Sequence, residues 1–124
     1  MNNRELVLSY LDAFASGDPD AITAHVSDDF ENIQVGVLGT GCTGKEAYRE
    51  RLKNFLSDFT GLKYHAEALI VDGDDVAAPY RMSFIQNEQS FDIQGVMVLR
   101  VRDGRIAVRK DYWDGLEYQR QAGQ

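Results

Sequence analysis

The chain has 124 residues, 44% of them hydrophobic and 27% charged, and a formal net charge of −7. This length and composition predict a single globular domain over residues 1–124, built around one hydrophobic core. Lys and Arg are scattered among the acidic residues instead of forming a basic stripe. Nucleic acid and anionic membrane surfaces would therefore be repelled, and neither is expected as a partner.

Motifs for metal binding, redox chemistry and export are not found in the sequence. Cys42 is the single cysteine, which excludes an internal disulfide and a two-thiol zinc motif, and His25 and His65 are the only histidines. We therefore expect no metal and no cofactor. Residues 1–5 contain no apolar core of a signal peptide, and no run reaches the roughly 18 apolar residues of a membrane span, so we expect a cytoplasmic protein.

The N-terminal part of the chain predicts two helices and a strand. The first helix follows a cap at Asn2 or Asn3 and is predicted by apolar residues at helical spacing: Leu6, Val7, Tyr10, Leu11 and Phe14. Asp18-Pro19-Asp20 predicts a second, short helix that runs to about Val26. Pro fits the first helical turn, and an Asp side chain accepts hydrogen bonds from the unpaired amide N–H groups of that turn. The alternation of Ile33, Val35 and Val37 then predicts a strand.

A glycine-rich loop begins at Gly39 and leads into the longest predicted helix. The order Gly39-Thr40-Gly41-Cys42-Thr43-Gly44 formally resembles a dinucleotide-binding fingerprint. Hairpins follow it instead of a parallel βαβ unit, so we interpret it as a turn. Thr43 and Glu46 predict a capping box at the helix start. One face of this third helix carries Tyr48, Leu52, Phe55, Leu56 and Phe59.

From Leu62 onward the pattern changes to strands separated by turns. Breaks at Asp72-Gly73-Asp74, Asn87-Glu88-Gln89 and Asp103-Gly104 divide the predicted strands, which cover residues 62–71, 76–86, 90–102 and 105–113. Three helices followed by hairpin-linked strands predict an α+β fold in which the helices pack on one face of a mostly antiparallel sheet. A sheet of this length has to curl, and a curled sheet capped by helices encloses a cavity.

Several segments of the sequence resemble SnoaL-like proteins. In the first half they are residues 10–18, Ser27-Asp28-Asp29-Phe30 and Gly44-Lys45-Glu46-Ala47. In the second half, residues 91–96, 102–106 and 110–114 are similar to the closing hairpin of that family and of limonene epoxide hydrolases. The resemblance implies the nuclear transport factor 2 superfold, a cone of curved sheet with helices over its mouth. It also implies a homodimer formed through the sheet.

The resemblance to epoxide hydrolases implies a site around Asp111. In those enzymes an Arg between two Asp residues positions and activates the attacking water. Arg81 and Asp111 match the Arg and one Asp, while the position of the other Asp holds Ser83. A hydroxyl cannot neutralise the guanidinium or share the proton transfer, so epoxide hydrolysis is not expected.

The resemblance to ketosteroid isomerases and polyketide cyclases implies other chemistry. Tyr10 matches the tyrosine of the isomerase oxyanion hole, but Gln34 stands at the position of the general base and Met97 at that of the protonated Asp. That isomerase mechanism is therefore not expected. The cyclases of the SnoaL group work by acid–base catalysis with carboxylates in the pocket, and this chemistry stays open.

Strand alternation and the resemblance together give a hypothesis for an enzyme acting on a largely apolar, oxygenated small molecule as an isomerase, cyclase or hydrolase. Alternation places Arg109, Asp111 and Trp113 on one face of the last strand, which the family pattern directs into the cone. Asp111 would be the acid–base group, Arg81 would orient it, and Tyr10 would donate to a developing oxyanion. The expected ligand contacts are Phe14, Ser83, Phe91, Ile93, Arg109 and Trp113.

An alternative hypothesis uses the same cone without catalysis. Asp111 and an arginine would then form a structural ion pair, and Tyr10 would be a core residue with an incidental hydrogen bond. The absence of carboxylates at Ser83 and Gln34 favours this alternative. The protein would then be a ligand-binding or dimer-scaffold module.

Overall fold

The computed structural model describes residues 1–36 and 38–123, and its first helix begins where the sequence predicts it. Helix α1 (Asn3–Ala13) starts at Asn2, whose side chain accepts a hydrogen bond from the amide of Glu5. The side chain of Glu5 accepts one from the amide of Asn2 in return, which completes a capping box. A short 3₁₀ turn, η1 (Phe14–Ser16), ends at Gly17, whose φ of 69° favours glycine.

Helix α2 (Pro19–Thr23) confirms the helix start predicted at Asp18, whose side chain accepts a hydrogen bond from the amide of Asp20. The helix ends earlier than predicted, because Val26 is already the first residue of strand β1 (Val26–Val35). This strand starts well before the alternating residues from which it was predicted. Val37, the last of those residues, lies outside the part of the chain that the structure describes.

Helix α3 (Lys45–Asp58) does not have the capping box predicted from Thr43 and Glu46. Thr43 belongs to the short strand β2 (Cys42–Thr43) and pairs with Glu31 of β1, so its backbone is part of the sheet. Gly44 takes the cap position with a φ of 97°, and Glu46 forms an ion pair with Arg49. The capping-box prediction was therefore wrong.

The rest of the chain is the predicted series of hairpin-linked strands. They are β3 (Thr60–Ala66), β4 (Ile70–Asp72), β5 (Asp75–Gln86), β6 (Gln89–Arg102) and β7 (Arg105–Trp113). The strand predicted over residues 62–71 is interrupted after Ala66 and forms β3 and β4. Asp103 and Gly104 connect β6 to β7 with φ angles of 52° and 74°, which is the geometry that Asp-Gly favours in a tight hairpin.

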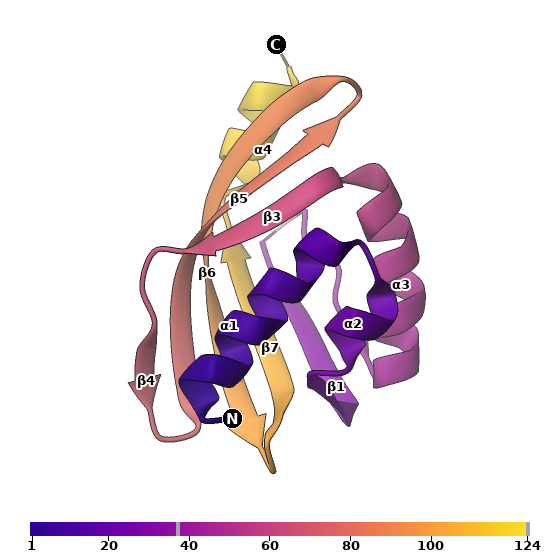
Figure 1. Ribbon diagram of the computed structural model, residues 1–124. Coiled ribbons are helices and arrows are strands. Elements are labelled where there is room, and N and C mark those ends of the chain that lie inside the picture. The colour runs from indigo at the N-terminus through magenta and orange to yellow at the C-terminus, as the bar shows by residue number, and fades with distance from the viewer. Residues whose placement is uncertain (37, 124) are drawn as a thin grey trace.

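The strands form one curved sheet with the order β2-β1-β7-β6-β5-β3, and β4 pairs with β5. The described pairings are antiparallel, except that β1 and β7 run parallel. Figure 1 shows the long strands β5 and β6 bending across the molecule, with α1, α2 and α3 on one side of the sheet. The predicted α+β fold, with a curved, mostly antiparallel sheet and helices on one face, is confirmed.

A fourth helix, α4 (Gly115–Ala122), was not predicted. It is short, mostly polar and has no fully buried residue, so it offers few apolar positions from which a helix can be predicted. Contacts to the sheet fix its position: Tyr118 donates to Gln86 over 2.6 Å, and Gln121 donates to the carbonyl of Asp92 over 2.9 Å. The sequence does contain a signal for the start of α4. Asp114 is a favourable N-cap residue, and its side chain accepts a hydrogen bond from the amide of Glu117.

The core lies between the concave face of the sheet and the helices. Every second residue of the long strands points into it, beginning with Val76 on β5 and Phe91 on β6, and the helices contribute Val7, Leu11 and Leu52. This alternation has period two, so a side chain's position in the strand decides whether it meets the interior or solvent. The site depends on this alternation.

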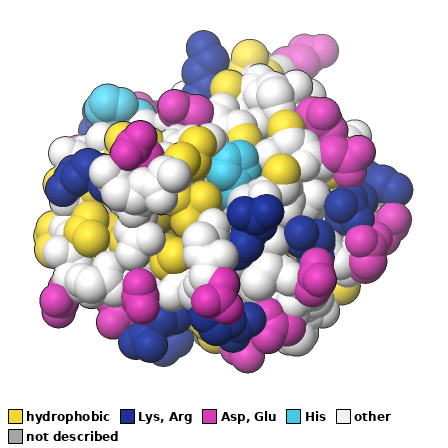
Figure 2. All heavy atoms as spheres, turned by 60° about the horizontal axis from the view of Figure 1, so that its bottom comes forward, with side chains coloured by type: hydrophobic (Ala, Val, Ile, Leu, Met, Phe, Trp, Pro, Cys, Tyr) yellow, Lys and Arg dark blue, Asp and Glu magenta, His cyan; other side chains and the backbone are white. Residues whose placement is uncertain are grey.

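The surface seen in Figure 2 has acidic and basic side chains close to one another. Ion pairs such as Arg100 with Asp75 and Arg102 with Asp29 join neighbouring elements on the outside of the protein. Within residues 1–36 and 38–123, no helix combines the length and the hydropathy needed to cross a bilayer.

Candidate functional site

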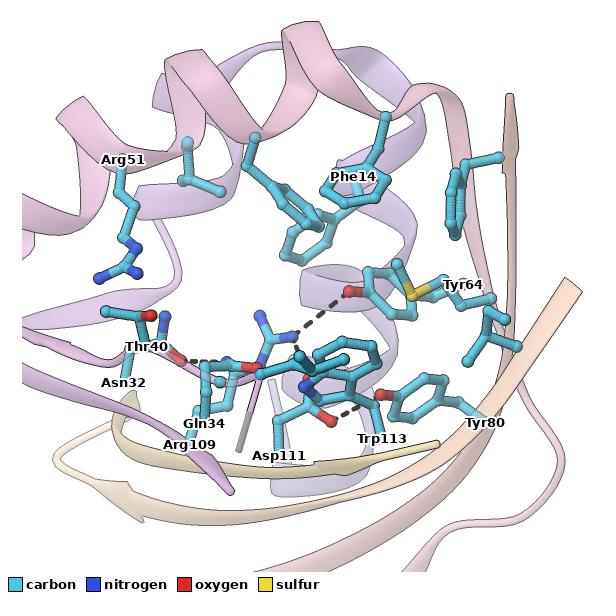
Figure 3. Close-up of a pocket in the computed structure, with 18 of the residues that line it drawn as sticks. Phe14, Asn32, Gln34, Thr40, Arg51, Tyr64, Tyr80, Arg109, Asp111 and Trp113 are labelled. Atoms are coloured by element: carbon cyan, nitrogen blue, oxygen red, sulfur yellow. Dashed lines mark hydrogen bonds and ion pairs between the residues drawn. The ribbon is translucent and has the colours of Figure 1, made fainter. Parts of the chain in front are cut away.

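A cavity of about 440 Å³ lies between the concave face of the sheet and the helices. Its polar lining consists of Asn32, Gln34, Thr40, Arg51, Arg109 and Asp111. Its aromatic lining includes Phe14, Tyr48, Phe55, Phe59, Tyr64, Tyr80, Phe84, Trp113 and Tyr118. Figure 3 shows Arg51, Thr40 and Asn32 on one side of Arg109 and Asp111, with Tyr64 and Tyr80 on the other.

Arg109 and Asp111 form a buried ion pair at the floor of the cavity. They lie two residues apart on β7, so both side chains point to the concave face, as predicted. Nη2 of Arg109 donates to Oδ2 of Asp111 over 2.7 Å, and the two side chains are only 5% and 4% exposed. The hydroxyl of Tyr80 donates to the other carboxylate oxygen over 2.5 Å. Both oxygens of Asp111 therefore act as acceptors, which is the bonding pattern of an ionised carboxylate.

Tyrosine hydroxyls surround the guanidinium of Arg109. Nη1 donates to Tyr10 over 2.8 Å and to Tyr48 over 3.3 Å, while Nη2 donates to Tyr64 over 3.3 Å. The hydroxyls of Tyr10 and Tyr48 are also bonded to each other. This arrangement offers a buried cation several oxygen partners besides its carboxylate, which offsets the cost of its desolvation.

Burial changes the protonation behaviour of this network. It raises the pKa of Tyr10, Tyr48 and Tyr64, and it raises that of Tyr80 together with the charge of Asp111. Burial alone would lower the pKa of Arg109, but the tyrosine oxygens and Asp111 outweigh burial and raise this pKa well above its ordinary value. The tyrosines are therefore neutral hydrogen-bond donors at neutral pH, and Arg109 is a permanent cation.

Gly95 makes room for the hydrogen bond between Tyr80 and Asp111. It lies on β6 between Tyr80 on β5 and Trp113 on β7. A Cβ atom at Gly95 would come within 2.5 Å of the hydroxyl oxygen of Tyr80 and 2.6 Å of its ring. The phenol ring crosses the strand through the space that this glycine leaves.

Two predicted site residues, Arg81 and Ser83, lie outside the cavity. Both point to the convex face of β5, whereas Tyr80 and Met82 point inward. Nε of Arg81 lies 3.2 Å from Oδ1 of Asp92 on the neighbouring strand, and these side chains are 52% and 58% exposed. The predictions that Arg81 orients Asp111 and that Ser83 contacts a ligand were therefore wrong in their placement, and Arg109 is the arginine beside Asp111.

The remaining predicted residues divide into two groups. Phe14, Ile93, Arg109, Asp111 and Trp113 line the cavity, as expected. Tyr10 and Phe91 are buried behind the lining, so their predicted direct contact with a ligand is not supported by their positions. Phe91 stacks on Phe84 at 4.9 Å between ring centroids, and the Tyr10 hydroxyl is occupied by Tyr48 and Arg109.

The sequence also matches a known family. The SnoaL-like domain model covers residues 7–109 of the chain. The chain belongs to the SnoaL-like domain family. The match ends at Arg109, so Asp111 and Trp113 lie just beyond the matched segment. No curated protein sequence matches this SnoaL-like domain.

Solved structures share the fold of this SnoaL-like domain. A protein with a ketosteroid isomerase-like fold from Catenulispora acidiphila, in complex with trimethylamine, has a TM-score of 0.87 at 18% identity, covering 96% of this chain and 92% of its own. An epoxide hydrolase of the limonene type from Mycobacterium tuberculosis has a TM-score of 0.84 at 21% identity, covering 98% and 90%. A proposed SnoaL-like polyketide cyclase from Jannaschia has a TM-score of 0.83 at 20% identity, covering 96% and 90%. The expected superfold of nuclear transport factor 2 is thereby confirmed.

Sequence reasoning missed several members of the site in this SnoaL-like domain. Tyr80 and Tyr64 were not singled out, although both lie on the inward alternation of their strands. Asn32 was also missed, because β1 was predicted from residues after it. The register of the parallel pair β1–β7 sets Asn32 beside Arg109, and the side chain of Gln34 donates to Asn32 over 2.8 Å.

The glycine-rich segment of the SnoaL-like domain packs against β1, and Cys42 and Thr43 within the predicted turn form strand β2. A Cβ atom at Gly39 would lie 2.7 Å from Cβ of Gln34, and one at Gly41 would lie 2.4 Å from the carbonyl oxygen of Asn32. These glycines therefore permit a close approach of two backbones. Among the described residues, no three His, Cys, Asp or Glu side chains are grouped so that they could hold a metal ion.

Proposed function

We propose that this SnoaL-like domain binds a small, largely apolar, oxygenated molecule and that Asp111 transfers protons to and from it. The observation that carries the proposal is an ionised Arg109–Asp111 pair on the floor of a cavity with largely aromatic walls. A volume of about 440 Å³ lies within the roughly 300–1,000 Å³ of ordinary ligand pockets. Apolar walls with a few polar groups are also typical of such pockets.

Asp111 is the candidate general base. Each of its oxygens accepts one hydrogen bond from the protein, Oδ1 from Tyr80 and Oδ2 from Arg109, and each keeps a further lone pair. Such a carboxylate can take a proton from a carbon next to a carbonyl group or from a hydroxyl group, and later return it. Arg109 and Tyr80 would act as positioning residues that fix the direction of the carboxylate.

Tyr64 is the candidate hydrogen-bond donor to the ligand. Its hydroxyl oxygen accepts from Nη2 of Arg109 over 3.3 Å, and no residue in the described part of the chain accepts a hydrogen bond from it, so its proton can be donated to a ligand. Burial raises the pKa of Tyr64, so the hydroxyl stays protonated at neutral pH. Polarised by Arg109, it would stabilise the negative charge that develops on a carbonyl oxygen when Asp111 removes the neighbouring proton.

Exchange of carbon-bound protons tests this chemistry without knowledge of the natural substrate. A cyclic ketone such as 2-decalone is incubated with the protein in deuterium oxide, and deuterium uptake next to the carbonyl is followed by mass spectrometry. The wild type is expected to accelerate uptake over buffer. Asp111→Asn is expected to reduce the acceleration by about 100-fold or more, the usual contribution of a general base.

Matched variants separate a catalytic role from a structural one. Asp92→Asn changes an exposed carboxylate of the convex face and is expected to leave the exchange rate unchanged. Because Asp111→Asn weakens the partner of a buried arginine, its folding is checked by circular dichroism. Tyr80→Phe keeps the ion pair and removes one hydrogen bond, so it is expected to slow exchange less than Asp111→Asn. An exchange rate that Asp111→Asn leaves unchanged would remove Asp111 from the mechanism.

A second candidate function, ligand binding without catalysis, is favoured by one observation. Both oxygens of Asp111 already have partners within the protein, and so does the hydroxyl of Tyr10. If this second function is correct, calorimetry is expected to show that the same ketone binds, while the protein does not accelerate deuterium uptake. The rate of deuterium uptake by the bound ketone therefore distinguishes the two functions.

A further inference from the structure

We propose that the ligand of this pocket carries a carboxylate or a similar anionic oxygen group, recognised at the end of the cavity where Arg51 lies. We call this part the arginine end and define it by Asn32, Thr40, Arg51 and the neighbouring side of Arg109. The inference rests on the proposed function, because it assumes that the pocket takes a small molecule. It adds the chemical class of that molecule.

Arg51 brings a positive charge to the lining that the protein does not neutralise locally. Its side chain extends from α3, and Nη1 donates to the carbonyl of Gly41 over 2.6 Å. Within residues 1–36 and 38–123, no carboxylate lies within 4.0 Å of its guanidinium, whereas Arg49, Arg81 and Arg100 each pair with one. In a protein of net charge −7, a half-buried arginine without an acidic partner in the wall of a cavity is suited to an anion.

The neighbours of Arg51 are also polar. The loop that Arg51 binds packs on β1 at Asn32, and Asn32 pairs with Arg109 in the parallel register. Figure 3 shows Arg51 directed toward Thr40 and Asn32, with Arg109 beyond them. These residues offer amide, hydroxyl and guanidinium groups, which are the partners that a carboxylate needs when it leaves water.

Arg109 adds to the positive potential of the arginine end. The charge of Arg109 is balanced by Asp111. The carboxylate of Asp111 accepts from Nη2 of Arg109 and from Tyr80, and it makes no hydrogen bond to Nε of Arg109. Its Nε is buried and has no hydrogen-bond partner among the described residues. The positive end of this N–H bond is therefore uncompensated by the protein, which favours negative charge nearby.

The other part of the cavity fits an apolar ring system. Phe59 contacts Phe84 edge to face with 4.6 Å between centroids, and Trp113 contacts Tyr118 at 5.9 Å. A flat aromatic acid would place its rings among these side chains and its carboxylate at Arg51. Since like charges repel, the carboxylate would lie away from Asp111, which leaves Asp111 to meet the body of the ligand.

A matched pair of probes tests the inference. 2-Naphthoate and 2-naphthamide have the same rings and differ in charge, and their dissociation constants are measured by calorimetry at low salt in a buffer without phosphate. The wild type is expected to bind the naphthoate about tenfold more tightly, as a charge-assisted hydrogen bond provides. Arg51→Gln is expected to bring the two affinities within about twofold, while Arg81→Gln, on the convex face, keeps the wild-type preference.

Each outcome has a distinct meaning. If the amide binds as tightly as the naphthoate, the anionic class is wrong and the pocket remains a binding site for neutral molecules. A preference that survives Arg51→Gln would show that the arginine end does not recognise the anion. If 2-naphthoate, 2-naphthamide and the cyclic ketone all fail to bind, both the proposed function and this inference are wrong. Loss of the preference at high salt, with the amide unaffected, would support it.

Discussion

At the scale of single residues, the site is a buried ion pair completed by tyrosines. Arg109 is nearly inaccessible, and its charge is tolerated because Asp111, Tyr10, Tyr48 and Tyr64 all accept from it. Buried pairs of this kind add little net stability, but removing one partner leaves a charge without compensation. The network therefore fixes side-chain positions more than it stabilises the fold.

Gly95→Ala is expected to disturb this network from a neighbouring strand. The new methyl group would meet the hydroxyl and ring of Tyr80 at 2.5–2.6 Å, so the ring has to leave Asp111 or the strands have to separate. Overpacking of this kind costs about 1–3 kcal/mol, which urea denaturation measures. In a Tyr80→Ala background the same substitution is expected to cost less. An equal loss of unfolding free energy in both backgrounds would show that the new methyl group does not clash with Tyr80.

The buried tyrosines predict a loss of stability at alkaline pH. Burial raises the pKa of Tyr10, Tyr48, Tyr64 and Tyr80 above the ordinary value of 10.0. The unfolded chain therefore loses these protons at lower pH than the folded one. The stabilisation is complete below pH 10 and declines as pH rises toward the folded pKa, by up to about 1.4 kcal/mol per pH unit for each tyrosine.

Urea denaturation between pH 8 and pH 11 measures this decline, and ultraviolet absorbance of tyrosinate follows ionisation. Tyr48→Phe is expected to reduce the slope above pH 10, because it removes one group that ionises only on unfolding. A slope that is unchanged in Tyr48→Phe would contradict the assignment of a raised pKa to this residue.

At the scale of elements, strand alternation and the resemblance together predicted the pocket residues of the last strand, while the resemblance alone misplaced two residues of β5. Alternation grouped Arg109, Asp111 and Trp113 on one face of β7, and the family pattern correctly directed that face inward. On β5 the resemblance placed Arg81 and Ser83 in the site, although the alternating apolar residues Tyr80, Met82 and Phe84 belong to the buried face. The hydrophobic effect decides which face of a strand is buried, and a polar residue matched to a distant relative does not change it.

Other features of the elements could not be predicted, because they depend on contacts distant in the sequence. Helix α4 buries no residue fully and is positioned against the sheet by hydrogen bonds of Tyr118 and Gln121. The partnership of Asn32 with Arg109 depends on the register of a parallel pair, which no local pattern specifies. Local patterns therefore predicted the strands and most helices, while tertiary contacts determined how the pocket is completed.

Tyr118→Ala is expected to loosen α4 at the aromatic part of the pocket. The ring packs near Phe84 and Trp113, and its hydroxyl donates to Gln86, so the helix would lose its main attachment. Hydrogen exchange of residues 115–122 is expected to become faster, with the rest of the protein little changed. Leu116→Ala is the control, because Leu116 is 79% exposed. Equal exchange in both variants would show that other contacts hold α4.

At the scale of the whole molecule, the convex face of the sheet carries an apolar row that crosses three strands. The register sets Pro79 of β5 beside Val96 of β6, and Val96 beside Tyr112 of β7. Val98 lies next along β6 on the same face and is 39% exposed, and Tyr112 is 44% exposed. We propose that this row is the contact of a homodimer formed through the sheet, because apolar surface of this kind is stabilised by a partner.

Val98→Glu is expected to convert such a dimer to monomers, because it would bring a charge into an apolar contact from each subunit. Light scattering coupled to size-exclusion chromatography measures the mass in solution. Leu116→Glu changes an exposed apolar residue of α4 and is expected to leave the mass unchanged. A wild-type mass of about 14.0 kDa would mean that the row does not mediate dimerisation.

The parallel pairing of β1 with β7 has a consequence for how the protein folds. It joins a strand near the start of the chain to the last strand, and β7 carries Arg109, Asp111 and Trp113. Contacts between distant segments form slowly, because a long loop must close before they are gained. The floor of the pocket is therefore expected among the late parts to assemble, so ligand binding during refolding would report a finished molecule and not an intermediate.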